Sequence, residues 1–404
     1  MITLKQFTLF LISILFSSYA IAQSINLTEK AEISILTIGP GNYLYDKFGH
    51  SAIRVKDKNI GIDMVFNYGT YDFNTPNFYS KFARGKLLYS LSLSDFTDFF
   101  QYYRKEDRWI TEQLLNLNNN QKKAVFQLLM ENAKPENREY LYDFTYDNCA
   151  TRIRDILSLA LEDKIDFPTT QTNTSFRDLI QENLHSNTWG SIGIQLALGA
   201  SMDRHISRLE QQFLPNYVLK ANTETHIKNN NKGWFPLVKE TNYLNKQKKI
   251  KKSSFSITSP WVIFSILGAL LFISVWRDKR NENRTKYVDI TIFTITGVIG
   301  LILVFLWFGT DHQATKFNYN ILWAFPLNIF FIKTISSNNY NKRIIQFINL
   351  LRILLFLMFF HWVTGVQKFP IPILPLLIGL LIRYNYLVNF YTKKSDKTSI
   401  NTYL

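Results

Sequence analysis

The sequence has little cysteine, and Cys149 is the only one in 404 residues. A single cysteine cannot form an intramolecular disulfide, so an exported domain of this chain must be held together by its core alone. Cysteine often packs as a small hydrophobe, which is the structural alternative to a reactive thiol. The residues around Cys149 must therefore decide between these two interpretations.

The sequence also lacks the signatures of nucleic-acid binding, in spite of its charge. Lys and Arg number 46 against 31 Asp and Glu, a formal net charge of +15. No zinc pattern, RNA-binding signature or basic recognition helix accompanies this excess. Many of the basic residues lie beside apolar segments, where membrane topology and anionic lipid headgroups account for them. We therefore expect a membrane as a partner, and no nucleic acid.

The chain divides into parts of different character. Residues 1–22 predict a signal peptide, with an apolar stretch followed by an A-x-A cleavage site that ends at Ala22. The mature chain would begin at Gln23 and not at a cysteine, so we do not expect it to be a lipoprotein itself. Residues 23–250 have the mixed composition of a globular domain, whereas 251–404 alternate long apolar runs with short basic loops. The second part is predicted to be a transmembrane domain.

Five apolar segments of the second part approach the roughly 20 residues that cross a bilayer as a helix. They lie near residues 260–276, 287–308, 319–335, 344–364 and 370–391. The loops predicted to be cytoplasmic are rich in Lys and Arg, whereas the two predicted outer loops contain only Lys316 and Lys368. This pattern obeys the positive-inside rule. We predict a multi-pass protein of the bacterial inner membrane, with residues 23–250 in the periplasm and the C-terminus inside.

Alternating and helical patterns in the first part predict an α+β domain. Strands are expected at 32–38, 51–56 and 63–68, and helices at 94–103, 119–132 and 150–161. Asp147 or Asn148 stands where the last of these helices would be capped. Cys149 would then lie in its first turn, where exposed N–H groups and the helix dipole favour the nucleophilic thiolate.

A nucleophilic thiol needs a base that can also return the proton to a leaving group, and histidine suits both roles near neutral pH. His50 follows a glycine and opens a predicted strand, so we favour it over His185 and His205, for which surface or capping roles are expected. A third group usually orients the imidazole. Asn67, on the next predicted strand, is the first choice, with Asp63 and Asp72 as rivals.

Three short motifs of the sequence resemble those of known families. The motifs Phe-Gly-His-Ser at 48–51, Phe-Asn-Tyr-Gly at 66–69 and Asp-Asn-Cys at 147–149 are similar to those of circularly permuted papain-like domains. Such domains occur in the NlpC/P60 and lecithin:retinol acyltransferase relatives. The closer resemblance is to the Lnb-type N-terminal periplasmic domain, and residues 311–315 and 318–323 resemble an outer-loop motif of the same family. The implied fold is a permuted papain-like thiol-enzyme domain followed by an all-α bundle of about five transmembrane helices.

The Lnb-type resemblance implies a lipoprotein N-acyltransferase with a papain-like Cys-His site and no cofactor or metal. Cys149 would attack a phospholipid acyl donor to form a thioester, and His50 would shuttle the proton. The amine of a diacylated lipoprotein would then take the acyl chain. Backbone N–H groups at the helix start, helped by Asn148, would stabilise the oxyanion.

Three further residues are candidates for substrate binding. Asp311 and His312 fall in the predicted outer loop between the second and third spans, where an ionisable pair at a membrane interface would hold a headgroup or the attacking amine. A plain surface loop is the alternative. Arg152 would bind phosphate or pair with Asp155.

The sequence is compatible with two other functions. A cell-wall or peptide amide hydrolase of the NlpC/P60 type would keep the Cys-His site and use water in place of the amine. The predicted spans argue against it, because a soluble substrate does not require them. The second alternative is a non-catalytic membrane assembly factor whose thiol is incidental.

Overall fold

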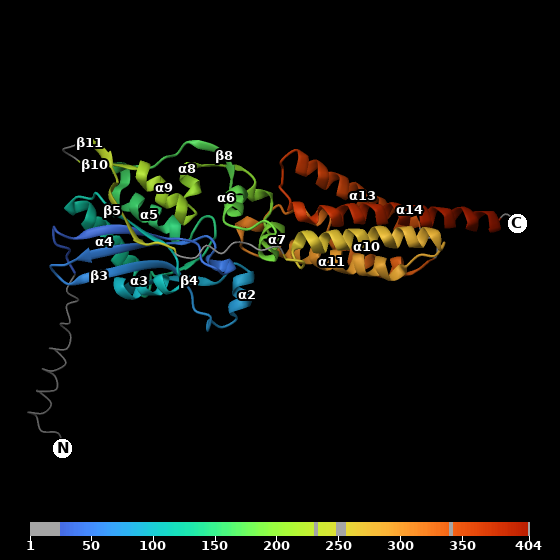
Figure 1. Cartoon of the computed structure of the whole chain (residues 1–404), viewed down its shortest axis with the longest axis horizontal. Coiled ribbons are helices and arrows are strands. Elements are labelled where there is room, and N and C mark those ends of the chain that lie inside the picture. The colour runs from blue at the N-terminus through green and yellow to red at the C-terminus, as the bar shows by residue number, and fades with distance from the viewer. Residues whose placement is uncertain (1–24, 230–232, 248–255, 339–341, 403–404) are drawn as a thin grey trace, which may run out of the picture.

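The computed structural model describes residues 25–229, 233–247, 256–338 and 342–402. The molecule is elongated, with an N-terminal domain of strands and helices at one end and a bundle of long helices at the other (Figure 1). The predicted signal peptide, residues 1–22, lies outside the described residues. The division into an α+β domain and a helical membrane part is confirmed.

A seven-stranded antiparallel sheet forms the centre of the first domain, in the order β12-β5-β1-β2-β3-β4-β6. Its strands are β1 (Glu32–Ile38), β2 (His50–Asp57), β3 (Ile62–Thr70), β4 (Leu88–Asp95), β5 (Ile110–Leu115), β6 (Glu139–Leu141) and β12 (Val238–Asn245). The three predicted strands are β1, β2 and β3, which lie side by side in the middle. The chain returns from position 238 to complete one edge of the sheet.

Helices cover both faces of this sheet, because side chains alternate along each strand. Helices α4 (Asn119–Asn132) and α5 (Cys149–Leu161) pack on the face that carries Ile53 and Phe66. Helix α3 (Phe96–Lys105) packs on the opposite face, against Ala52 and Val65. Burial of one such Ile or Phe side chain contributes about 1.5–3 kcal/mol. The two apolar layers therefore fix the positions of β2, β3 and α5, the elements with the predicted site residues.

Shorter elements complete the domain. They are α2 (Phe78–Ala83), α6 (Phe176–Glu182), α7 (Trp189–Ala197), α8 (Arg208–Gln211), α9 (Pro215–Glu224), β7 (Ile165–Asp166), β8 (Gln171–Ser175), β9 (His205–Ser207), β10 (His226–Asn229) and β11 (Gly233–Pro236). Helices α6 and α7 lie toward the bundle, and β10 and β11 lie at the opposite end (Figure 1). Arg177 on α6 is 1% exposed and binds Asp203 at 2.9 Å together with backbone carbonyls near the end of α7. This buried ion pair joins α6 to the segment that contacts the bundle.

Among the described residues of the second part, four helices are long and apolar enough to cross a membrane. They are α10 (Pro260–Arg280), α11 (Lys286–Phe308), α13 (Lys342–Val363) and the first part of α14 (Leu374–Thr402). The third predicted span, at 319–335, is wrong as a continuous helix. This stretch forms two 3-10 helices, η5 (Tyr319–Leu322) and η6 (Pro326–Phe331), and the short α12 (Ile332–Ser336).

The irregular stretch nevertheless runs from one end of the bundle to the other. At its start, Asn318 donates to the carbonyl of Leu196 in the N-terminal domain at 2.7 Å, and at its end the carbonyl of Ile335 accepts a hydrogen bond from Arg284. It packs along α11, where a Cβ on Gly300 would lie 2.2 Å from the carbonyl oxygen of Ala324. Non-helical backbone is tolerated at membrane depth where protein covers it. The third predicted span is therefore a crossing without a continuous helix.

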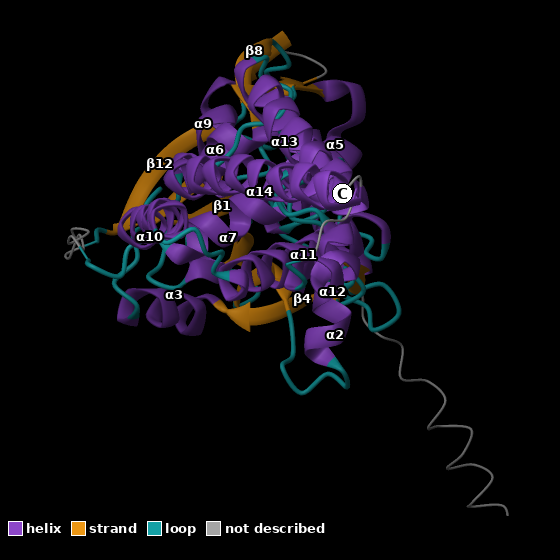
Figure 2. Ribbon diagram, turned by 90° about the vertical axis from the view of Figure 1, so that its right-hand side faces the viewer, coloured by secondary structure: helices purple, strands orange, loops and turns teal. Residues whose placement is uncertain are grey.

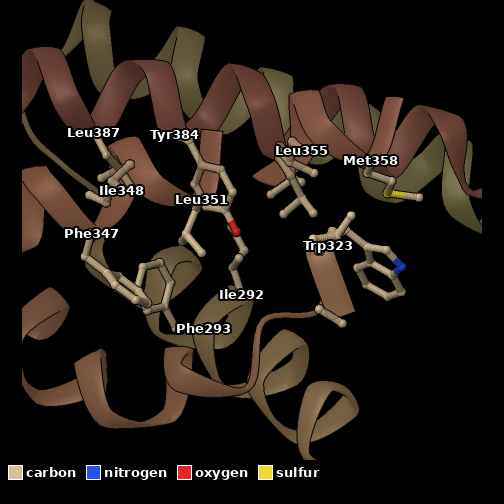
Figure 3. Close-up of a cluster of buried hydrophobic side chains, with 14 of the residues drawn as sticks. Ile292, Phe293, Trp323, Phe347, Ile348, Leu351, Leu355, Met358, Tyr384 and Leu387 are labelled. Atoms are coloured by element: carbon tan, nitrogen blue, oxygen red, sulfur yellow. The ribbon is translucent and has the colours of Figure 1, made fainter. Parts of the chain in front are cut away.

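One apolar core holds the irregular stretch to the helices (Figure 3). Phe347 on α13 stacks on Phe331 with ring centroids 3.7 Å apart. The ring centroid of Phe293 on α11 lies 6.1 Å from that of Phe347. Trp323, between η5 and η6, and Tyr384 on α14 are also buried. The broken segment thus supplies core residues and is an integral part of the bundle.

The outer loops of the bundle bind the N-terminal domain directly. The backbone N–H groups of Gly199 and Ala200 donate to the carbonyls of Ala314 and Phe317, each at 2.9 Å. Lys368 in the second outer loop forms an ion pair of 2.5 Å with Asp178. These contacts place the domain on the side that the positive-inside rule predicts.

Candidate functional site

The site begins where two central strands separate. Residues of β2 pair with residues of β3 from Asp57, opposite Ile62, to Ile53, opposite Phe66. The pairing stops there, before the first residue of β2, which is His50. Across the opening, His50 Nε2 lies 2.5 Å from Oδ1 of Asn67 on β3. The structure therefore brings together the first-choice pair from the sequence. The rivals lie elsewhere, because Asp63 binds Arg54 and Asp72 accepts hydrogen bonds from Asn74.

Two glycines shape the opening. Gly49 has φ +80°, and a Cβ there would lie 2.7 Å from the carbonyl oxygen of Ile38. Gly69 has φ +90° within an irregularity of the β3–β4 pairing, and a Cβ there would lie 3.6 Å from Cβ of Cys149. Positive φ is costly for other residues. The backbone at both positions therefore requires glycine, and at Gly69 the strand approaches the start of α5 closely.

Cys149 is the first residue of α5, as the capping pattern predicts, and it is half-buried. Asn148 is the N-cap, and its Oδ1 accepts the N–H groups of Ala150 and Thr151 at 2.7 and 3.0 Å. Its Nδ2 donates to the carbonyls of Phe144 and Phe213 at 2.6 and 2.9 Å. The side chain has two donors and two acceptor positions. All are used, so Asn148 fixes the start of α5 and has no donor left for an oxyanion.

Neighbouring groups locate the thiol and the imidazole at the same end of the sheet. The backbone N–H of Ser51, next to His50, acts on the pKa of the Cys149 thiol as a hydrogen-bond donor. Tyr103 on α3 stacks near His50, with ring centroids 6.1 Å apart. Burial raises the pKa of Tyr103, and a negative charge on Cys149 would raise it further. Helix α5 also packs against β2 and β3. Cys149, His50 and Asn67 therefore surround one opening.

Burial controls the protonation of both groups. It raises the pKa of the Cys149 thiol to about 11, although the N–H groups of Ser51, Cys149 and Ala150 act in the opposite direction. Burial lowers the pKa of His50 to about 4. The hydrogen bond with Asn67 raises this pKa, and the positive charge of Arg108 lowers it. Both groups are therefore neutral at pH 7 in the resting protein. The prediction that the helix dipole gives a thiolate is wrong for this state, because burial outweighs it.

The raised pKa predicts how alkylation of Cys149 depends on pH. Only the thiolate reacts, and at pH 7 roughly one thiol in 10⁴ would be ionised. The rate of iodoacetamide labelling should therefore rise about tenfold per pH unit from 7 to 9 without a plateau. Intact-mass spectrometry of the full-length protein measures it, with Cys149→Ala as the unlabelled control. A rate that stays constant from pH 6 to 9 would instead reveal a preformed thiolate–imidazolium pair.

Arg108 is a part of the site that sequence reasoning missed. Its side chain is nearly completely buried, and Nε donates to the carbonyl of Gly39 at 2.7 Å. The guanidinium lies over the ring of Tyr103, 4.9 Å from its centroid, and Nη2 has no hydrogen-bond partner among the described residues. Its positive charge lowers the pKa of both His50 and Cys149. No motif marks Arg108, because only the pairing of β5 with β1 brings it near the site.

Arg152 pairs differently from the sequence alternatives. Its guanidinium binds Asp147 through two hydrogen bonds, one of them from Nη2 to Oδ2 at 2.6 Å, and lies over the ring of Tyr140 at 4.2 Å. Asp155 instead pairs with Arg154 at 2.7 Å. Arg152 thus braces the loop before α5, and its expected pairing with Asp155 is wrong.

The other predicted residues do not join this opening. The outer-loop pair, Asp311 and His312, binds the end of α2 and the turn after it. The N–H of Asp311 donates to the carbonyl of Arg84 at 2.9 Å, and Nε2 of His312 lies 3.0 Å from the carbonyl oxygen of Phe82. His185 lies in an exposed loop. His205 and His226 begin β9 and β10, and the second is a further histidine of the domain that sequence reasoning overlooked. Among the described residues, no group of three or more His, Cys, Asp or Glu could hold a metal ion.

Comparison with known families agrees with this two-part architecture. The profile of the Lnb N-terminal periplasmic domain matches residues 19–182, and that of the Lnb transmembrane domain matches residues 250–395. No curated protein and no solved structure matches the chain. The two profiles together cover more than half of the sequence, in the order of the α+β domain and the bundle. Lnb domains indicate lipoprotein-modifying membrane enzymes. This chain therefore belongs to the Lnb family, as a multi-pass inner-membrane protein with a periplasmic N-terminal domain.

Proposed function

We propose that this protein is a lipoprotein N-acyltransferase that uses Cys149 as its nucleophile. It would move a fatty acyl chain from a phospholipid to the terminal amine of a diacylated lipoprotein through a thioester. The observation that supports this most is the hydrogen-bonded His50–Asn67 pair at the strand opening beside the first residue of α5. The arrangement has the parts of a papain-like thiol site, namely a nucleophile at a helix start, a histidine and a group that orients it.

The hydrogen bond to Asn67 assigns the two nitrogens of His50. Because Oδ1 of Asn67 can only accept, Nε2 carries the proton and donates it across the 2.5 Å contact. Nδ1 is then unprotonated and acts as the base. Since the thiol and the imidazole are both neutral at rest, proton transfer accompanies attack instead of preceding it. Asn67 is thus a positioning residue that holds the tautomer.

Two half-reactions complete the transfer. Sγ of Cys149 attacks the ester carbonyl of the phospholipid while Nδ1 of His50 takes the thiol proton. The tetrahedral intermediate collapses to a thioester, and His50 returns the proton to the departing hydroxyl of the lysophospholipid. The lipoprotein amine then attacks the thioester, gives its proton to His50, and leaves as an amide while the thiol is restored.

Negative charge in these steps would be stabilised by groups already at the opening. The N–H groups of Ser51 and Cys149 lower the pKa of the thiol, and in this proposal they also donate to the oxyanion. The buried cation of Arg108 favours any anionic species there, since it lowers the thiol pKa. The contacts of Gly199, Ala200 and Lys368 hold the domain on the membrane part, so that two membrane-bound substrates meet the thiol without free diffusion.

Mass spectrometry of cells with and without this protein tests the proposed reaction. Loss of the N-linked acyl chain from lipoprotein N-terminal peptides, with unchanged cell-wall muropeptides, is the expected result. Unchanged triacylated peptides together with altered muropeptides would instead indicate a peptide hydrolase. No change in either, with a defect in membrane assembly, would favour the non-catalytic alternative.

A further inference from the structure

A cavity of about 280 Å³ lies between the end of β3, the start of β4 and the α2 segment. This volume is at the small end of ligand pockets, which span roughly 300–1,000 Å³. Its wall includes the hydroxyl groups of Thr70 and Ser90. The mechanism above uses none of its residues.

The cavity wall contains equal numbers of positively and negatively charged residues. Lys81 and Lys86 supply two positive groups, and Asp72 and Glu139 supply two negative groups. Lys86 lies 3.9 Å from Asp311, whereas Lys81 forms no ion pair with any described residue. A site with both signs of charge and several hydroxyls suits a ligand that itself carries a phosphate and an ammonium group. A purely anionic ligand would face the two carboxylates.

The α2 segment is fixed to the loop that follows α11. The turn at Arg84 and Gly85 contacts residues 311–312, which follow the outer end of α11, and a Cβ on Gly85 would lie 3.2 Å from the N of His312. Phe82 on this segment is 53% exposed. Viewed along the bundle, α2 projects beyond the outline of the transmembrane helices (Figure 2). Exposed aromatic side chains beside a bundle are typical of the headgroup region.

Two residues of the cavity wall are adjacent in sequence to residues near the nucleophile. Thr70 in the wall follows Gly69, whose backbone approaches Cβ of Cys149 as described above. Glu139 precedes Tyr140, and a charge on Cys149 raises the pKa of that tyrosine in addition to its burial. In a glycerophospholipid, the ester carbonyls lie a few bonds from the phosphate. A headgroup in the cavity would thus leave an ester within reach of the thiol.

We propose that this cavity binds the zwitterionic headgroup of the acyl donor, with Lys81 and Lys86 facing the phosphate and Glu139 and Asp72 facing the ammonium. The proposal rests on the proposed acyl transfer and adds a donor class to it. The outer-loop residues Asp311 and His312 would act indirectly, because they hold the turn that carries Lys86.

Lipid binding to full-length Cys149→Ser protein in detergent tests the cavity without needing catalysis. Native mass spectrometry would compare dioleoyl phosphatidylethanolamine, dioleoyl phosphatidylglycerol and dioleoylglycerol. Phosphatidylethanolamine should bind most tightly. Lys81→Gln should weaken both phospholipids about tenfold, as expected when charge-assisted hydrogen bonds are lost. Glu139→Gln should weaken phosphatidylethanolamine alone, and Lys105→Gln on the exposed end of α3 serves as the matched control.

Other outcomes separate the two proposals. Equal binding of dioleoylglycerol and phosphatidylethanolamine, unaffected by Lys81→Gln, would overturn the headgroup site. Equal loss of both phospholipids in Glu139→Gln would overturn the recognition of an ammonium group. The wild-type protein is incubated with the same lipids to detect an acyl adduct on Cys149. Headgroup-selective binding without any adduct would contradict the acyl transfer alone, and an adduct formed equally from all three lipids would contradict the cavity alone.

Discussion

Replacing Cys149 by serine should lower acyl transfer by at least about 10³-fold, the scale seen when an enzyme loses its nucleophile. The serine hydroxyl would occupy the same position in the first turn of α5. It is far less acidic than a thiol, however, and the neutral imidazole of His50 is a weak base in this buried setting. The measurement is N-acylation of a synthetic diacylated lipopeptide by purified full-length protein in phospholipid micelles, followed by mass spectrometry.

Ser158→Ala, on an exposed position of the same helix, is the matched control for this substitution. It should leave the rate of transfer unchanged. Both variants should retain the thermal stability of the wild type, so that a loss of activity reports chemistry and not folding. A Cys149→Ser protein that keeps its activity within tenfold of the wild type would refute the role of the thiol.

Replacing Arg383 by methionine should destabilise the membrane part by about 3–5 kcal/mol, the usual penalty for breaking a buried ion pair. Arg383 on α14 forms buried ion pairs with two other helices of the bundle. Its Nε lies 2.6 Å from Asp289 on α11, and its Nη1 lies 2.7 Å from Asp278 on α10. Arg284 lies 3.4 Å from Asp289 in the same cluster. Without Arg383, two buried carboxylates would share one cation.

Thermal unfolding in detergent, followed by intrinsic fluorescence, measures this effect. A loss of that size corresponds to a Tm roughly 10 °C lower. Arg277→Met, on an exposed position near the end of α10, removes the same charge and should shift the Tm little. Equal Tm values for Arg383→Met and the wild type would show that the network contributes no net stability. Some buried ion pairs can likewise be replaced by apolar residues without loss of stability.

The sequence predicted the elements whose pattern is local. The strands expected at 32–38, 51–56 and 63–68 are β1, β2 and β3, and the cap before Cys149 follows from the side chain of Asn148. The pairing of Asn67 with His50 could also be predicted, because the two strands are consecutive and antiparallel. These features depend on short stretches of chain.

The third crossing shows why hydropathy alone was insufficient. Residues 319–335 are apolar enough for a helix, but Pro326 opens η6 and Asn328 donates to Thr296 on α11 at 2.7 Å. The irregular backbone is covered only because Gly297 and Gly300 let it approach α11. Such cover depends on a contact between separate segments, which a hydropathy window does not contain.

The electrostatics of the site likewise depend on distant segments. The helix start alone predicts a lowered thiol pKa, whereas the burial that raises it comes from the packing of α5 against β2 and β3. Arg108 reaches the site through the β1–β5 pairing. Asp311 and His312 were predicted to lie at the membrane interface, but their partners in the turn after α2 could not be derived from spacing.

Trapping the acyl-enzyme tests the role of Cys149 most directly. Purified full-length protein is incubated with a phospholipid of defined acyl chain in the absence of a lipopeptide, and its intact mass and Cys149 peptide are measured. We expect a mass increase of one acyl chain on Cys149, which hydroxylamine removes and which a diacylated lipopeptide discharges as an N-acyl product. Transfer to the lipopeptide without any adduct on Cys149, at time points shorter than one turnover, would contradict the thioester mechanism.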